Sequence, residues 1–288
     1  VIPVLRDLHL ASRTLYAEFA GSGLDFGYGE RGRLLVCDTA EGLADAVAEG
    51  HHMNDAGLAS EELDPAAVAS FLGDVPVNCV GGVFYPQDAH LDPARFVQAL
   101  ARKARDAGVE IVESAEVLRI HSRDRAVTTV DTTRGTYQPE QLVLAAGAWS
   151  PSLATGLGLN LPIQPAKGYS VEIEAPADAP DVPFMLTEAK VGVTPLGGNR
   201  LRFAGTLELA GLDLSVNRRR VEAIVRAVPR YLPGWDPAEF SVREIWRGLR
   251  PCTPDGLAAL GRPRAWDNVV LAAGHAMIGM SLGPVTGQ

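Results

Sequence analysis

Apolar residues recur at helical spacing in two stretches of the chain. Residues 3–20 predict one amphipathic helix, and residues 92–107 predict a second. In the second helix Asp92 is suited to cap the first turn, Pro93 occupies the first helical position and Gly108 follows the last turn. Its apolar stripe consists of Phe96, Val97, Leu100 and Ala104. Both ends of this element are therefore defined by local sequence signals.

Shorter apolar runs predict strands. Residues 26–39 predict a strand pair joined by a glycine turn, and residues 109–114 predict a strand directly after the second helix. Residues 142–147 form a continuous apolar run, as expected for a strand buried on both faces of a parallel sheet. Residues 168–209 instead contain alternating runs, which are typical of antiparallel strands with one wet face. The pattern indicates an α/β protein with two domains, each built from separate stretches.

Composition and charge narrow the range of functions. The 288 residues are 47% hydrophobic, and the net charge is −9 with acidic and basic residues interspersed. Because a nucleic-acid partner needs a clustered basic face, we expect none. No apolar run approaches the roughly 20 residues that span a bilayer, and the N-terminal residues lack the features of a secretion signal.

Cysteine and histidine residues give no sign of a metal site or a disulfide framework. Cys37, Cys79 and Cys252 lie far apart and form no C-x-x-C pair, which is typical of reduced thiols in the cytoplasm. His51 and His52 lack a second set of ligands at metal spacing, so we interpret them as a solvated helix end.

Arg250 is the first candidate for ligand binding. It lies between Leu249 and Pro251 in an apolar, turn-forming context. A planar guanidinium can pair with both oxygens of a carboxylate, so the residue is suited to hold a small acid. The alternative is a structural salt bridge, for example to Asp255 or Glu244.

The C-terminal segment is the second candidate. Residues 269–273 predict an apolar strand, residues 274–279 a glycine-rich turn, and the following residues the start of a helix that the chain does not complete. The free N–H groups and positive dipole of a helix N-terminus favour an anionic ligand group, although an ordinary strand-to-helix turn is the alternative. Residues 279–283 also match G-x-S-x-G, but residues 284–288 contain neither the acid nor the histidine that a hydrolase needs after its serine.

Four segments together resemble one known family. They are residues 81–100, 142–154, 201–213 and 246–288, and they occur in the order that the family has. The chain resembles the D-amino-acid oxidase superfamily of FAD-dependent oxidoreductases, most of all the small subunit of the bacterial D-amino-acid dehydrogenases. The family begins with a βαβ unit whose G-x-G-x-x-G turn binds the FAD diphosphate, and this chain contains no such turn. The chain also begins without methionine and ends one turn into a helix. We therefore expect a fragment of a larger enzyme, or a second chain that supplies the rest.

The resemblance implies a domain layout. Residues 1–22, 88–165 and 251–288 would form a partial, Rossmann-like FAD-binding domain. Residues 23–87 and 166–250 would form a substrate-binding domain with an antiparallel sheet.

The resemblance also implies site residues. The expected cofactor-binding residues are Val117, Ala146, Gly147, Trp149, Gly274, His275, Met277, Ile278 and Gly279. The expected substrate-binding residues are Arg250, Tyr85, Thr206 and His275. For most of these positions a structural role is the competing interpretation; for Thr206 a change of strand register would turn the side chain outward.

The activity that the resemblance implies is oxidative deamination of a D-amino acid, by hydride transfer to flavin, to a 2-oxo acid and ammonia. No side chain is expected to act as a catalytic base, because the lone pair of the amine drives the hydride out. One alternative is a related enzyme that acts on glycine, sarcosine or proline-like amines. Another is a non-catalytic fragment that cannot hold FAD. The resemblance implies a cytoplasmic protein and allows a respiratory electron acceptor and peripheral association with the inner face of the cytoplasmic membrane.

Overall fold

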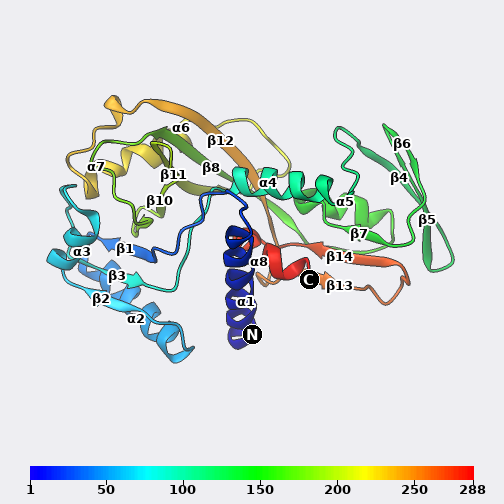
Figure 1. Cartoon of the computed structure of the whole chain (residues 1–288), viewed down its shortest axis with the longest axis horizontal. Helices are drawn as coiled ribbons and strands as arrows, with labels where there is room; N and C mark the ends of the chain where they lie inside the picture. The colour runs from blue at the N-terminus through cyan, green and yellow to red at the C-terminus, as the bar shows by residue number, and fades with distance from the viewer. The chain divides into compact units, whose positions relative to one another are not determined.

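A computed structural model describes residues 1–288 and has a mixed α/β fold (Figure 1). The helices are α1 (Ile2–Gly21), α2 (Ala40–Asp55), α3 (Pro65–Leu72), α4 (Pro93–Asp106), α5 (Ser150–Thr155), α6 (Arg218–Arg226), α7 (Val228–Tyr231) and α8 (Gly279–Thr286), with 3-10 turns at Gly147–Trp149 and Pro237–Glu239.

The strands form three sheets. They are β1 (Arg33–Cys37), β2 (Glu61–Leu63), β3 (Gly81–Tyr85), β4 (Val117–Arg123), β5 (Ala126–Thr132), β6 (Gly135–Tyr137), β7 (Leu142–Leu144), β8 (Gln164–Glu174), β9 (Phe184–Leu186), β10 (Val191–Pro195), β11 (Arg200–Glu208), β12 (Val242–Cys252), β13 (Ala259–Gly261) and β14 (Val269–Ala273). The expected combination of helices with parallel and antiparallel strands is confirmed.

Residue contacts divide the chain into two compact units. Unit 1 comprises Val1–Ala99, Gly168–Leu207 and Leu214–Gly248, and unit 2 comprises Leu100–Lys167, Glu208–Asp213 and Leu249–Gln288. Each unit is thus assembled from separate stretches of sequence.

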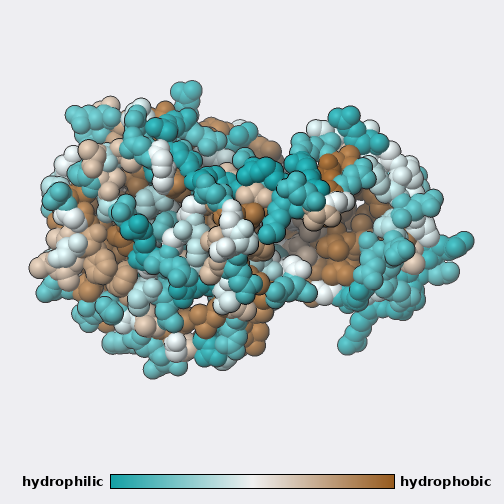
Figure 2. Space-filling view, viewed as in Figure 1, coloured by the Kyte–Doolittle hydropathy of each residue, from teal (hydrophilic) through white to brown (hydrophobic).

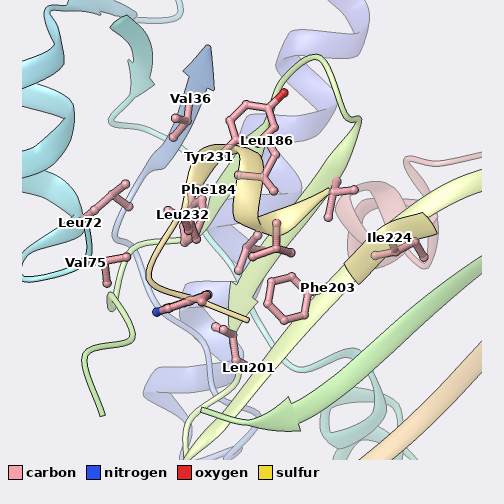
Figure 3. Packing of buried hydrophobic residues seen from close by; sticks show 14 of the residues in the cluster. Val36, Leu72, Val75, Phe184, Leu186, Leu201, Phe203, Ile224, Tyr231 and Leu232 are labelled. Carbon is pink, nitrogen blue, oxygen red and sulfur yellow. The ribbon is translucent and has the colours of Figure 1, made fainter. Parts of the chain in front are cut away.

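Unit 1 is built on an eight-stranded sheet in the order β12-β8-β11-β10-β9-β1-β3-β2. Its main core packs against this sheet, and Figure 3 shows the centre of that packing. Fully buried members include Val36, Leu186, Phe203, Ile224 and Tyr231. The side chains come from the sheet and from α6 and α7, so burial of apolar surface joins elements distant in sequence.

Unit 2 contains two small sheets. In one, β14 lies between β13 and β7, and in the other β5 lies between β4 and β6. Its core is a small cluster around Val127, Val130, Leu157 and Val269. In the space-filling view hydrophobic residues also reach the surface around β7 and β14 (Figure 2), where Val143 is 57% exposed.

The first predicted helix is confirmed as α1, which packs within unit 1 through aromatic rings. Tyr16 of α1 and Phe96 of α4 have ring centroids 4.9 Å apart, and Phe26 lies 5.0 Å from Phe96. These contacts group residues 1–22 and 88–99 with unit 1. The boundaries expected from the sequence assign both stretches to the FAD-binding portion, and that assignment stays a prediction.

The second predicted helix is confirmed as α4, including its cap. Asp92 is 1% exposed, and its Oδ1 accepts hydrogen bonds from the backbone N–H groups of Ala94 and Arg95. The predicted apolar stripe is wrong in part. Phe96 is buried, but Val97 is 58% exposed, and Ala99 is buried in its place.

Three predicted strand features differ from the structure. The stretch 26–39 contains only one strand, β1, which pairs with β3 and β9 rather than with its own neighbour. Residues 109–114 form no strand. Only residues 142–144 of the run 142–147 form a parallel strand, β7, and Val143 is exposed rather than buried. In each case hydrophobicity predicted an extended segment, while the available partner strands determined whether and where it paired.

Glu188 joins three segments of unit 1. Its carboxylate accepts hydrogen bonds from Tyr231 Oη at 2.8 Å, from Thr39 Oγ1 at 2.9 Å and from the backbone N–H groups of Thr39 and Asp38 at 3.1 and 3.2 Å. Burial alone would raise the pKa of this carboxyl, but the hydrogen bonds from Tyr231 and from the start of α2 lower it from 4.5 to about 2. The ionised form of Glu188 thus stabilises the fold.

Glu188→Gln should remove the part of the free energy of unfolding that depends on ionisation of this carboxyl group. Because the folded-state pKa lies below the unfolded one, this contribution is complete above about pH 4.5 and is lost as the pH falls towards about 2. Urea unfolding between pH 7 and pH 3 should therefore show a flatter pH dependence for the variant than for the wild type. Glu222→Gln, on the exposed side of α6, is the control and should keep the wild-type slope. An unchanged slope in Glu188→Gln would contradict the role of this carboxylate.

Candidate active site

The candidate site begins with a pair of parallel strands in unit 2. β7 and β14 pair in register, with Leu142 beside Val269 and Leu144 beside Leu271. Parallel strands end at the same edge of a sheet, so the segments that follow them emerge together. These segments contain eight of the nine expected cofactor-binding residues, namely Ala146, Gly147, Trp149, Gly274, His275, Met277, Ile278 and Gly279. The carboxyl edge of parallel strands is where open α/β sheets bind ligands.

Both segments turn sharply through glycine. Gly147 has φ +54° and Gly274 has φ +82°, a region that favours glycine. The turn after β14 then leads into α8, whose N-cap residue Ile278 contributes no side-chain hydrogen bond. The first N–H groups of an α-helix point along its axis and carry the positive end of its dipole, so the start of α8 presents that end to the turn. Met277 in this turn is 73% exposed, and Trp149 in the other is 47% exposed.

Arg250 lies next to this turn. It precedes Pro251 in β12, and the carbonyl oxygen of Pro251 accepts a hydrogen bond of 3.0 Å from the backbone N–H of Ala276. All of these residues belong to unit 2. The structure thus brings the candidate carboxylate-binding residue and the candidate cofactor turn together through one backbone contact.

Burial changes the electrostatics of Arg250. The guanidinium is partly withdrawn from water, and this burial lowers its pKa, while the nearby Cys252 acts in the opposite direction. A partly desolvated cation gains more from an incoming anion than an exposed one does. Of the two acids considered as salt-bridge partners, Asp255 accepts a hydrogen bond from the backbone N–H of Leu257 in its own turn, and Glu244 is exposed.

His275 has a structural partner. Its Nε2 lies 3.0 Å from Thr286 Oγ1, and that hydroxyl donates to the carbonyl oxygen of Leu282 at 2.9 Å. Since the Thr286 hydroxyl proton is used in that bond, Thr286 Oγ1 is placed to accept from the imidazole when Nε2 carries the ring proton. Burial lowers the pKa of His275, which keeps the ring neutral at pH 7. In this arrangement the side chain fastens the turn to the last part of α8.

Val117, the remaining expected cofactor contact, opens β4 in unit 2. Its side chain packs against the apolar cluster around Val130 and Val269. The side chain is thus occupied by the core, so a contact with a ligand would have to be made by the backbone.

Tyr85 and Thr206 lie in unit 1. Tyr85 is 5% exposed and packs with Leu35 and Cys37 in the cluster beneath α2, and its hydroxyl has no hydrogen-bond partner. Thr206 has φ +61° within β11, an unusual backbone conformation for a β-branched residue that is often retained at functional positions. Their expected role in substrate binding stays a prediction.

Thr253 is not among the site residues that the sequence predicts. A Cβ atom added to Gly274 would come within 2.8 Å of Thr253 Cγ2, so the two residues are packed as closely as glycine allows. The sequence held one signal for this contact, a small β-branched residue three positions after Arg250, but no local pattern connects residue 253 with residue 274.

The residues at this edge fit FAD in chemical character. FAD contains flat apolar rings, and its reduced flavin carries negative charge that backbone N–H groups and a helix N-terminus stabilise. The edge offers the uncapped start of α8, two glycine turns that allow close backbone approach, and exposed apolar side chains. No group of three or more histidine, cysteine, aspartate or glutamate side chains is arranged to hold a metal ion. None of the helices combines the length and hydropathy needed to cross a membrane.

Comparison with known families gives one match over almost the whole chain. Residues 3–288 match the family model described as FAD dependent oxidoreductase, abbreviated DAO.

Curated relatives include a D-amino acid dehydrogenase of Paramagnetospirillum magneticum, 35% identical over 285 residues, which covers 97% of this chain and 67% of that protein. The D-amino acid dehydrogenase of Vibrio atlanticus is 33% identical over 224 residues, covering 77% of this chain and 53% of that protein. The chain thus spans little more than half of the length of this relative.

Among solved structures, glycine oxidase from Geobacillus kaustophilus superposes with a TM-score of 0.90 at 28% identity, covering 98% of this chain and 76% of that one. L-proline dehydrogenase from P.horikoshii superposes with a TM-score of 0.85 at 19% identity, covering 97% of this chain and 76% of that one, and shows the same fold.

The burial of His275 predicts the pH range in which its ring becomes protonated. Because burial lowers the pKa of the folded state, protonation should occur below the ordinary value of 6.5. NMR titration of the histidine ring signals, assigned with a His275→Gln variant, should give a midpoint below 6.5 for His275. A midpoint at or above 6.5 would mean that the ring is exposed and does not fasten α8.

Proposed function

Because the chain belongs to the DAO family of FAD-dependent oxidoreductases, we propose that it oxidises a D-amino acid to a 2-oxo acid and ammonia. The observation that carries the proposal is the hydrogen bond between Pro251 and Ala276. It joins the strand of Arg250 to the turn that leads into α8, so a carboxylate held by Arg250 would lie close to a group bound at that turn.

In the proposed reaction Arg250 binds and orients the substrate. Its guanidinium would hold both carboxylate oxygens, and partial burial would strengthen this charge-assisted pair. The Cα hydrogen is then presented in one orientation, which removes much of the entropic cost of the encounter.

The start of α8 and the exposed apolar residues have a second role. The positive end of the helix dipole would stabilise negative charge that develops next to the turn 274–279. Trp149 and Met277 would cover bound ligand and exclude water from it. His275 would hold the turn in place through Thr286 rather than transfer a proton.

The cofactor supplies the redox chemistry: FAD, when bound, accepts two electrons and a proton from the substrate. The amino acid, bound with a neutral amine, would lose its Cα hydrogen with the bonding pair while the nitrogen lone pair forms the carbon–nitrogen double bond, which leaves an iminium ion that keeps both nitrogen protons. Water then adds to the carbon–nitrogen double bond, and ammonia leaves to give the 2-oxo acid. These steps balance without a side-chain base.

Three further parts of the assignment are proposals. Val117, Ala146, Gly147 and Gly279 would contact FAD, and Tyr85 and Thr206 the substrate. Unit 2 would carry the cofactor and unit 1 much of the substrate domain.

Electrons would pass to a respiratory acceptor, with the protein bound peripherally to the cytoplasmic membrane. Flotation with liposomes is the direct test of the last point.

A second candidate is oxidation of glycine or another small amine, such as sarcosine or proline. The structural similarity to a glycine oxidase at 28% identity favours it, and an arginine that binds the carboxylate serves these substrates equally well. Reduction of a dye acceptor by a panel of D-amino acids, glycine, sarcosine and proline separates the two candidates.

Arg250→Lys is the test of the anchor. A lysine keeps the charge but loses the bidentate geometry, so affinity for an amino-acid substrate should fall by about 10-fold or more. Affinity for FAD, measured by the change in flavin fluorescence, should stay near the wild-type value. Arg102→Lys, on the exposed surface of α4, is the control and should change neither affinity.

Two results would count against the proposal. Unchanged substrate affinity in Arg250→Lys would remove the anchor role. A purified chain that shows no flavin absorbance and takes up no added FAD would favour a non-catalytic fragment.

A further inference from the structure

We propose that Thr253 is a positioning residue that fixes the carboxylate-binding strand relative to the cofactor turn. This inference rests on the proposed function, since it concerns the distance between Arg250 and the segment 274–279. Thr253 itself would touch neither substrate nor cofactor. It would set the position of the Arg250 strand through its contact with Gly274.

The contact between Thr253 and Gly274 is unusually close. A Cβ at Gly274 would approach Thr253 Cγ2 to 2.8 Å, and the backbone N–H nitrogen of Ala259 and Ile163 Cδ1 to 3.5 Å each. Gly274 also has φ +82° and is buried. The turn therefore lies flat against the methyl group of Thr253, with no room for even one further carbon atom.

The methyl group of Thr253 is held in place by the hydroxyl group on the same carbon. Thr253 Oγ1 donates a hydrogen bond of 2.8 Å to the carbonyl oxygen of Leu257. Because Oγ1 and Cγ2 share the Cβ atom, fixing one rotamer fixes both. The surrounding turn is closed by the bond from the backbone N–H of Leu257 to Asp255 Oδ1 at 3.1 Å.

Two contacts thus connect residues 251–253, at the end of β12 and directly after it, with the cofactor turn on either side of His275. Pro251 bonds to Ala276 through the backbone, and Thr253 packs on Gly274 through its methyl group. A single hydrogen bond would act as a hinge, whereas two separated contacts prevent rotation. Thr253 therefore determines the angle at which the strand of Arg250 meets the turn.

A double-mutant cycle isolates the contact. Gly274→Ala should weaken binding of propanoate, an amino-acid analogue without the amine, because the new methyl group must push Thr253 away. Thr253→Ser removes Cγ2 and makes room, so Gly274→Ala should cost less in that background. The strain of alanine at φ +82° occurs in both backgrounds and cancels. We expect the two losses of affinity to differ by about threefold or more.

The measurement is the change in the flavin spectrum when propanoate is added to the FAD-loaded protein, together with the affinity for FAD and the thermal midpoint of each variant. Thr253→Val keeps the shape but loses the bond to Leu257, so it should weaken propanoate binding, while Thr136→Ser in β6 should not. FAD affinity should stay within about twofold of wild type in the Thr253 variants, since the residue positions the substrate strand.

Two outcomes would overturn the positioning role. Additive effects of the two substitutions would show that the residues do not act through each other. Thr253 variants with a lower thermal midpoint but unchanged propanoate affinity would show a purely structural residue. Either result leaves the proposed function intact if the wild type binds propanoate and Arg250→Lys weakens that binding. If the FAD-loaded wild type shows no response to propanoate, the proposed function fails and this inference fails with it.

Discussion

The parallel pairing of β7 with β14 is the constraint on which the candidate site depends. The two strands run side by side in register, with Leu144 beside Leu271. A shift of this register by two residues would move one turn about 7 Å along the sheet edge relative to the other. The residues after Leu144 and those after Ala273 would then no longer meet at one place. The small unit that carries the site therefore depends on three pairs of neighbouring residues in a short sheet.

In the proposed site one backbone hydrogen bond and one close packing contact, rather than ion pairs, hold the strand of Arg250 against the turn 274–279. Ala276 bonds to Pro251, and Gly274 packs on Thr253. Arg250 is the only arginine or lysine in the proposed substrate site. Its partial burial strengthens the attraction between its charge and a carboxylate. Such an arrangement suits a reaction in which a cofactor performs the redox step and the protein supplies orientation and electrostatics.

Local sequence signals predicted the elements better than their partners. The cap at Asp92 and the helix after it were predictable because one side chain and a few backbone groups within one turn determine them. The pairing of strands was harder to predict. Residues 109–114 have the apolar residues of a strand but join no sheet, and β1 pairs with β3 and β9 rather than with the segment before it. Partner choice depends on which other segments are available, and this information is not local.

The same distinction holds for the site. Arg250 and the turn 274–279 were identified in the sequence because guanidinium chemistry and glycine spacing are visible in a single segment. Their proximity was not visible, since it arises from a hydrogen bond between residues 251 and 276. Thr253 was not identified in the sequence for the same reason. Tyr85 was selected from its neighbours in the sequence, which do not show that its ring packs in the cluster beneath α2.

A crystal structure of the protein grown with FAD and propanoate would show whether Arg250 and the turn 274–279 form one site. The proposed site requires the propanoate carboxylate within hydrogen-bond distance of the Arg250 guanidinium, and the flavin ring next to the turn 274–279. Propanoate bound away from Arg250, or FAD bound away from the carboxyl edge of β7 and β14, would contradict it.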